Sequence, residues 1–113
     1  MDLATRHKWG MNQGRGTFST SKTDTAKIPA KVDGFAAVKY HAMLDEIYLT
    51  ATTGEATMRP QSSTVTGPLM VCDAHDTERF TGPIEFADGE SVDIVCSGVG
   101  EYWLTWHYES KGN

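Results

Sequence analysis

Residues 89–108 read GESVDIVCSGVGEYWLTWHY, and this stretch decides the fold class of the chain. In its first half, Val92, Ile94 and Cys96 alternate with Ser91, Asp93, Val95 and Ser97, which is the pattern of a β-strand with one buried face. Its second half is rich in aromatic and β-branched residues, which favour strands. Because Gly98-Val99-Gly100 stands between the halves, we expect a β-hairpin whose two arms meet at a glycine turn.

The second arm of this expected hairpin carries tryptophan on both faces. Successive side chains of a strand point to opposite sides, so Trp103 and Trp106 lie on different faces. A strand with one solvated face does not normally place a tryptophan on each side, and Trp and Tyr are enriched where proteins contact each other. We therefore expect the second strand of this hairpin to contribute to the core with one face and to a subunit interface with the other. The residues concerned are Tyr102, Trp103, Leu104, Trp106 and Tyr108.

The rest of the body also reads as short strands separated by turns, and a length of 113 residues suits one domain. Residues 42–47 could also begin a helix, but the β-branched and aromatic residues that follow favour a strand. No segment shows a sustained helical period, so we predict an all-β domain over residues 32–113, built as a small antiparallel sandwich or barrel. The expected strands are 47–52, 69–72 and 80–86, with breaks or turns at 53–54, 76–79 and 87–90.

Residues 1–31 differ from this body in charge and composition. They carry six Lys and Arg against two Asp and Glu, whereas residues 32–113 carry four against thirteen. The segment 10–25 is rich in Gly, Ser and Thr and has no apolar period, so it cannot bury enough surface to order alone. We expect an extended, partly disordered N-terminal arm. Its isolated apolar residues suggest that it orders on a partner, and a plain disordered tail is the alternative.

The sequence shows neither a membrane span nor a secretory signal, because its apolar runs are short and its first residues are polar and charged. We expect synthesis in the cytoplasm. The two cysteines, Cys72 and Cys96, stand in strand-like segments and are interpreted as buried free thiols that pack as small apolar residues. A disulfide between neighbouring strands and a metal site are the alternatives.

No set of residues predicts catalysis, a metal or a cofactor. The nearest is the segment 72–76, Cys-Asp-Ala-His-Asp, which lacks zinc-ligand spacing and reads equally well as a polar turn. A pair of Cys96 and His107 has no orienting third residue, and no phosphate loop or nucleophile elbow occurs. The basic residues of the arm are dilute, so nucleic acid is not expected as a partner. We therefore expect a protein that is not an enzyme.

The closing stretch resembles a known family. The pattern Gly-x-Ser-Val-x-Ile-Val at residues 89–95, then a glycine turn and an aromatic pair with tryptophan, is similar to the terminal hairpin of small bacteriophage virion proteins. These are capsid decoration (cement) proteins and the β-domains of tail fibres and spikes. An apolar strand ending in Asp73-Ala74, followed by residues 84–86, fits the same pattern, so the resemblance covers residues 67–108. The turn at 97–101 departs from the Asp-Gly-Thr type usual in that family.

This resemblance implies a structural virion protein without enzymatic activity. It implies a homotrimer that binds the outside of a phage capsid and stabilises it, with the major capsid protein as its partner. Such a protein is made in the host cytoplasm and is located on the capsid surface of the virion. A tail fibre or spike component is the alternative of the same class, and a carbohydrate-binding β-module is the alternative of another class. The arm would add strands to capsid subunits. The expected capsid-binding residues are Arg6, Lys8, Trp9, Met11, Arg15, Phe18, Lys22, Lys27 and Ile28.

Overall fold

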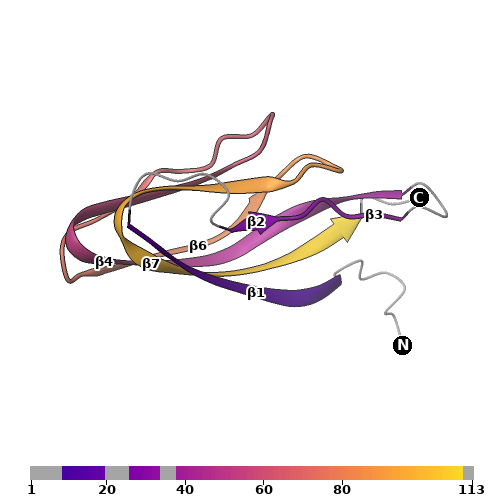
Figure 1. The fold of residues 1–113 in the computed structure, drawn as a ribbon. Coiled ribbons are helices and arrows are strands. Elements are labelled where there is room, and N and C mark those ends of the chain that lie inside the picture. Colours follow the sequence, from indigo (N-terminus) through magenta and orange to yellow (C-terminus); the bar gives the residue numbers. More distant parts are fainter. Residues whose placement is uncertain (1–8, 20–25, 34–37, 111–113) are drawn as a thin grey trace.

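The computed structural model describes residues 9–19, 26–33 and 38–110, and all regular structure in them is β-strand (Figure 1). Every pairing between the named strands is antiparallel, so the expected all-β sandwich is confirmed. Within these ranges no helix is long and apolar enough to cross a membrane. The strands are β1 (Trp9–Phe18), β2 (Lys27–Ile28), β3 (Val32–Asp33), β4 (Val38–Gln61), β5 (Met70–Cys72), β6 (Thr77–Glu85) and β7 (Val92–Ser110).

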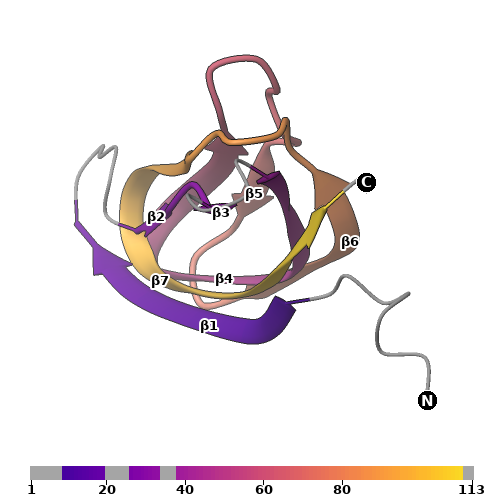
Figure 2. The same ribbon diagram turned by 90° about the vertical axis from the view of Figure 1, so that its right-hand side faces the viewer.

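Two long strands, β4 and β7, form the frame of the domain. They pair along nearly their whole length, from Tyr40 opposite Ser110 to Gln61 opposite Asp93. Both curve over together at the left of Figure 1, so each contributes to both layers of the sandwich. The first layer has the order β1-β7-β4-β6, and the second has the order β2-β7-β4-β5. Figure 2 shows the strands curving around the core.

The expected hairpin within residues 89–108 is wrong, because the chain runs through Gly98-Val99-Gly100 as one strand. β7 keeps pairing with β4 on both sides of these residues. The glycines mark the bend between the layers: Gly98 has a φ of 96°, and a side chain on Gly100 would overlap the carbonyl oxygen of Thr50. A glycine pair suits both a tight turn and a sharply bent strand, and the long-range pairing with β4 decides between them.

β4 passes in the same way through the expected break at residues 53–54. Gly54 adopts a φ of 66° there, and the register with β7 shifts between Ala51 and Thr53 and again between Thr53 and Thr57. The helix that residues 42–47 could have begun is absent, because they belong to β4. β6 begins at Thr77, so the turn expected at 76–79 is shorter than predicted. The other elements are confirmed, namely the strands at 69–72 and 80–86 and the turn at 87–90.

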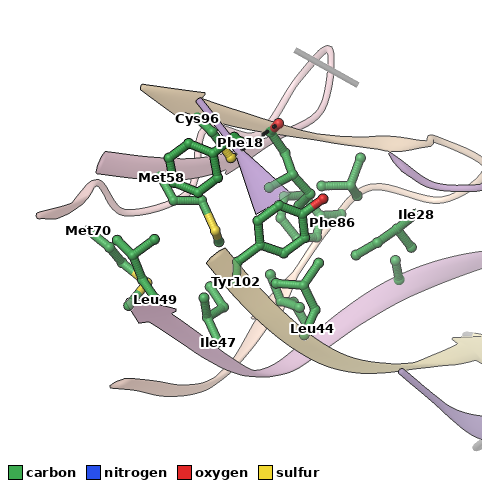
Figure 3. Close-up of a cluster of buried hydrophobic side chains, with 14 of the residues drawn as sticks. Phe18, Ile28, Leu44, Ile47, Leu49, Met58, Met70, Phe86, Cys96 and Tyr102 are labelled. Carbon is green, nitrogen blue, oxygen red and sulfur yellow. Dashed lines mark hydrogen bonds between the residues drawn. The ribbon is translucent and has the colours of Figure 1, made fainter. Parts of the chain in front are cut away.

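The core lies between the layers and takes side chains from both of them (Figure 3). Burial alternates along β7 as expected: Leu104 is fully buried, whereas its neighbour Trp103 is 43% exposed. Trp106 packs against the core, so the prediction that the two tryptophans lie on opposite faces is confirmed. The largest fully buried side chains include Phe86, Ile28, Leu44, Ile47, Leu49, Met58, Ile94 and Leu104.

Both cysteines are fully buried free thiols, Cys72 on β5 and Cys96 on β7, and this confirms their expected apolar role. Sγ of Cys72 donates a hydrogen bond to the carbonyl oxygen of Asp76 at 3.0 Å, which ties β5 to the start of β6. Burial raises the pKa of Cys96 to about 12, so this thiol is protonated at neutral pH and is a poor nucleophile.

Part of the expected N-terminal arm lies in this sandwich. Residues 9–18 form β1, which pairs with the second half of β7, and residues 27–28 form β2, which pairs with its start. Phe18 and Ile28 are buried in the core of their own chain. The Phe18 ring stacks on Tyr102 with a centroid distance of 6.2 Å. These two side chains are therefore not available to bind another protein.

Two glycines allow β1 to lie against the aromatic residues of β7. Gly14 and Gly16 alternate with outward-facing residues, and the rings of Trp106 and Tyr102 occupy the space that side chains would need there. A Cβ on Gly16 would overlap the Tyr102 hydroxyl, and a Cβ on Gly14 would stand 3.0 Å from the Trp106 ring. A glycine-rich segment that reads as flexible in the sequence is thus shaped to its neighbouring strand.

Candidate interaction surface

A row of four side chains crosses the outer face of the first layer. The strand register places Arg15 of β1 opposite Trp103 of β7, Trp103 opposite Tyr48 of β4, and Tyr48 opposite Arg79 of β6. All four strands of the layer therefore contribute one residue each. We call Arg15, Trp103, Tyr48 and Arg79 the aromatic row.

Each side chain of the aromatic row contacts the next. The Arg15 guanidinium lies 5.8 Å from the centre of the Trp103 ring, and Arg79 lies 5.4 Å from the centre of the Tyr48 ring. The two rings are 6.1 Å apart and tilted by 38°. Cation–π contacts of this kind contribute about 0.5–1 kcal/mol each at exposed sites. The row is therefore held in place before anything binds to it.

Arg79 has a second partner, Glu46, whose carboxylate lies 2.6 Å from the guanidinium. This hydrogen bond raises the pKa of Arg79 above its ordinary value. A shallow groove follows the row and is bordered by Thr50 and Glu101 on one side and by Glu46 on the other. A tryptophan and a tyrosine side by side, with an arginine at each end, have the composition found at the centres of protein interfaces.

The same face carries a buried imidazole, His107, at the end away from the bend. Its Nδ1 lies 2.7 Å from Oδ2 of Asp45, and its Nε2 lies 2.7 Å from Oε2 of Glu109. A β-bulge between Leu44 and Glu46 brings Asp45 into this position. Both ring nitrogens of His107 therefore lie within hydrogen-bond distance of a carboxylate oxygen.

A second buried imidazole, His41 on β4, stands opposite Glu109 and continues this cluster. Its Nδ1 lies 2.9 Å from Oδ1 of Asp88, and its Nε2 lies 3.4 Å from Oε2 of Glu85. The cluster ties β4, β7 and the end of β6 together, which is a structural role. The part of the chain that the structure describes holds no group of three or more His, Cys, Asp or Glu arranged to bind a metal ion.

A second exposed apolar surface lies on the outer side of the other layer. Val71 of β5 pairs with Thr57 and is 43% exposed, and Leu69 just before the strand is 51% exposed. The residues that alternate with them, Met70 and Cys72, are buried in the core. We call Leu69 and Val71 the β5 edge. Asp73, which is exposed, stands two positions after Val71 in the chain.

The structure distributes the sequence-predicted site residues over different places. Tyr102, Leu104 and Tyr108 belong to the core, and only Trp103 of the predicted interface set is exposed. Of the predicted arm residues, Arg15 joins the aromatic row and Lys27 lies 3.3 Å from the carboxylate of Asp93. The backbones of Trp9 and Met11 belong to β1. Three further arm residues lie outside the described residues: Arg6, Lys8 and Lys22.

Sequence reasoning missed Tyr48, Arg79 and the β5 edge. The alternation in Ile47-Tyr48-Leu49 does place Tyr48 on the solvent side of a strand whose neighbours are buried. A tyrosine on the outer face of such a strand was an available signal. Arg79 offered none, because only the pairing of β6 with β4 brings it beside Tyr48.

The remaining surface is acidic. Residues 38–110 contain twelve Asp and Glu but only three Lys and Arg. Near the bend, where the amide of Ala51 donates to the carbonyl oxygen of Asp76, several of these carboxylates are exposed. They are Glu55, Asp73, Asp76 and Glu78. The aromatic row is thus a small basic and aromatic area on an acidic domain.

No protein-family model and no curated protein sequence matches this chain. Solved structures do match its fold. The Drosophila NLP-core, described in connection with pentamer formation and histone binding, superposes with a TM-score of 0.55 at 16% identity, over 92% of this chain and 100% of that one. The nucleoplasmin-like N-terminal domain of Drosophila FKBP39 superposes with a TM-score of 0.50 at 8% identity, over 95% of this chain and 93% of that one. At these identities the likeness shows the fold alone.

These neighbours overturn the resemblance to bacteriophage virion proteins. The fold is that of nucleoplasmin-like domains, so the assignment as a capsid decoration protein is wrong. The expected partners are wrong with it, namely a homotrimer on a major capsid protein with nucleic acid not expected as a partner. The motif behind the resemblance consisted of β-forming and turn residues, which recur in many β-sandwiches. Its supposed glycine turn is the bend of a long strand.

Proposed function

We propose that this domain forms a ring of identical subunits and that the ring binds basic proteins of the histone type. The observation that carries the proposal is the strong acidity of a body with this fold, which has twelve acidic against three basic residues over 38–110. The Drosophila NLP-core, whose structure is linked to pentamer formation and histone binding, superposes over its whole length. We take a pentamer as the expected ring.

Electrostatics supports a basic partner. The exposed carboxylates near the bend, on Glu55, Asp73, Asp76 and Glu78, face solvent without a covering element in the described chain. A surface of one sign steers an oppositely charged protein toward it and raises the association rate. A ring repeats this surface once per subunit, and such repetition increases avidity for a partner that spans several subunits.

We further propose that the domain binds without catalysing a reaction. The thiol of Cys96 is buried and its pKa is raised to about 12, which does not suit a nucleophile. The two buried histidines are engaged by carboxylates at short distance. The role that fits these groups is to stabilise the fold.

Two measurements test the proposal. Size-exclusion chromatography with light scattering should give five times the chain mass at micromolar concentration. Fluorescence anisotropy with a labelled dimer of core histones should show saturable binding, weakened at least about tenfold from low to physiological salt. Lysozyme, a basic protein of unrelated shape, is the control for charge alone.

A variant with two neutral replacements, Glu55→Gln and Glu78→Gln, should keep the ring and bind the histone dimer less tightly. A chain that stays monomeric at high concentration would refute the ring. A ring that ignores histones, or binds lysozyme equally well, would refute the histone-type partner.

A further inference from the structure

We propose that the aromatic row of one subunit packs on the β5 edge of the next copy of this chain. The inference rests on the proposed ring and names the contact that builds it. Each subunit would offer its row to one neighbour and its β5 edge to the other. The contact is therefore head-to-tail, the kind that closes into a ring when the rotation between subunits allows it.

The first argument is the position of the exposed apolar side chains. In the described part of the chain, the large apolar residues that remain exposed are Trp103, Leu69 and Val71. Trp103 stands on the outer face of the first layer, whereas Val71 pairs with Thr57 and points outward from the second. One chain cannot bring these two surfaces together, because its own core lies between the layers. A second copy can cover both.

The second argument is charge complementarity. The aromatic row ends in a guanidinium on each side, from Arg15 and Arg79. The β5 edge is followed by the exposed carboxylates of Asp73 and Asp76. Guanidinium–carboxylate pairs at the rim of an apolar contact fix its register and suppress wrong pairings.

The same charges argue against two other binding partners for the row, namely a basic protein and the row of a second copy. A basic protein would meet Arg15 and Arg79, so its contacts belong on the carboxylates elsewhere on the domain. A symmetric contact of row against row would bring the arginines of two copies to the same small area, and like charges in an interface are unfavourable. The acidic surface around the β5 edge meets neither objection.

The arrangement of the row also suits a subunit contact. Its four side chains come from four hydrogen-bonded strands and already contact each other. Little side-chain entropy is then lost when a partner binds. A tryptophan held in this way is the kind of residue that dominates binding energy in interfaces.

The test uses one variant for each side of the contact. Trp103→Asp disables the aromatic row, and Val71→Asp disables the β5 edge. Each variant alone should lose the ring and elute at the mass of one chain. Mixed in equal amounts, they should give a species of twice that mass, because the intact β5 edge of the first variant binds the intact row of the second. Native mass spectrometry of the isotope-labelled mixture shows whether this species holds one chain of each kind.

The matched control is Thr81→Asp, which adds the same charge to an exposed position of β6 on the face of the row. It should leave the ring intact. Arg15→Asp is a second row variant and should also be rescued by Val71→Asp. Far-ultraviolet circular dichroism checks that every variant is folded.

The outcomes separate this inference from the proposed function. A wild-type ring with unchanged assembly in Trp103→Asp and Arg15→Asp overturns the contact and leaves the ring and its histone binding standing. Folded single variants that are monomeric alone and stay monomeric when mixed overturn the head-to-tail pairing. A monomeric wild-type chain overturns both proposals.

Discussion

The inner and outer faces of the first layer use the same kinds of side chain for opposite purposes. On the inner face, Tyr102 and Trp106 lie against the glycines of β1 and close the core. On the outer face, Trp103 lies beside Arg15 and remains 43% exposed. The residues Gly14-Arg15-Gly16 supply both environments by strand alternation. Strand alternation, rather than the kind of ring, therefore decides which of these aromatic side chains belongs to the core and which to the surface.

The largest expected effect is on the inner face. Leu104→Ala should lower the free energy of unfolding by about 2–5 kcal/mol, because it leaves a cavity at a fully buried position. Urea unfolding at a fixed protein concentration measures the change. Thr105→Ala, one position along on the other face, is the control and should change stability by less than about 1 kcal/mol. Equal losses in the two variants would contradict the division into faces.

The outer face also has a buried end, which contains His107, and a substitution there should cause the second largest loss of stability. His107→Phe removes the donor between Asp45 and Glu109, which lie 2.7 Å from its two nitrogens. Because both carboxylates are partly exposed, we expect a loss of roughly 1–3 kcal/mol rather than that of a fully buried pair. Urea unfolding of His107→Phe beside Asp45→Asn shows whether the loss arises from the unpaired carboxylates. An unchanged midpoint would mean that the cluster contributes nothing to the fold.

Gly16→Ala tests whether β1 needs a glycine to lie against Tyr102. The new Cβ would overlap the hydroxyl of Tyr102, whose ring is held in the core, so β1 must shift outward. Overpacking of this kind costs about 1–3 kcal/mol. Compared with the wild-type chain, Gly16→Ala should exchange the amide hydrogens of β1 faster, and this increase should be larger in β1 than in β4. Thr17→Ala, the exposed neighbour, should leave both strands unchanged, and equal protection in Gly16→Ala would show that the glycine is not needed.

Alkaline pH should weaken the inner face alone. Burial raises the pKa of Cys96 to about 12 from 9.0 and that of Tyr102 to about 12 from 10.0. The unfolded chain therefore loses these protons first, and stability falls as pH rises from about 9 toward 12. Below about pH 9 both groups keep their protons in the folded and the unfolded chain, so stability has its full value there. The two groups together should cost roughly 2 kcal/mol at pH 10, most of it from Cys96. Urea midpoints at pH 8 and pH 10 in reducing buffer measure it, and a Cys96→Val variant with the same pH dependence would contradict this origin.

The sequence predicted what depends on neighbouring residues and failed where distant strands decide. Alternation placed Trp103 and Trp106 on opposite faces correctly, because strand geometry is local. Gly98 was taken for a turn because the same glycine serves a turn or a bend, and only pairing with β4 distinguishes them. Phe18 was assigned to a partner because its true neighbour, Tyr102, is distant in the chain. The aromatic row could not be predicted, because only the register of four strands brings its residues together.

The smallest effect belongs to the end of the aromatic row. Arg79 pairs with Glu46 at 2.6 Å and lies over Tyr48, but its side chain is 54% exposed, so solvent screens both contacts. In a Val71→Asp background, where we expect no assembly, Arg79→Ala should leave the urea midpoint of unfolding nearly unchanged. High salt should reduce the difference further, since screening acts on exposed charges. If this variant instead costs as much as Leu104→Ala, the row stabilises the fold itself, and the contrast between a closed inner face and an outer face kept for a partner fails.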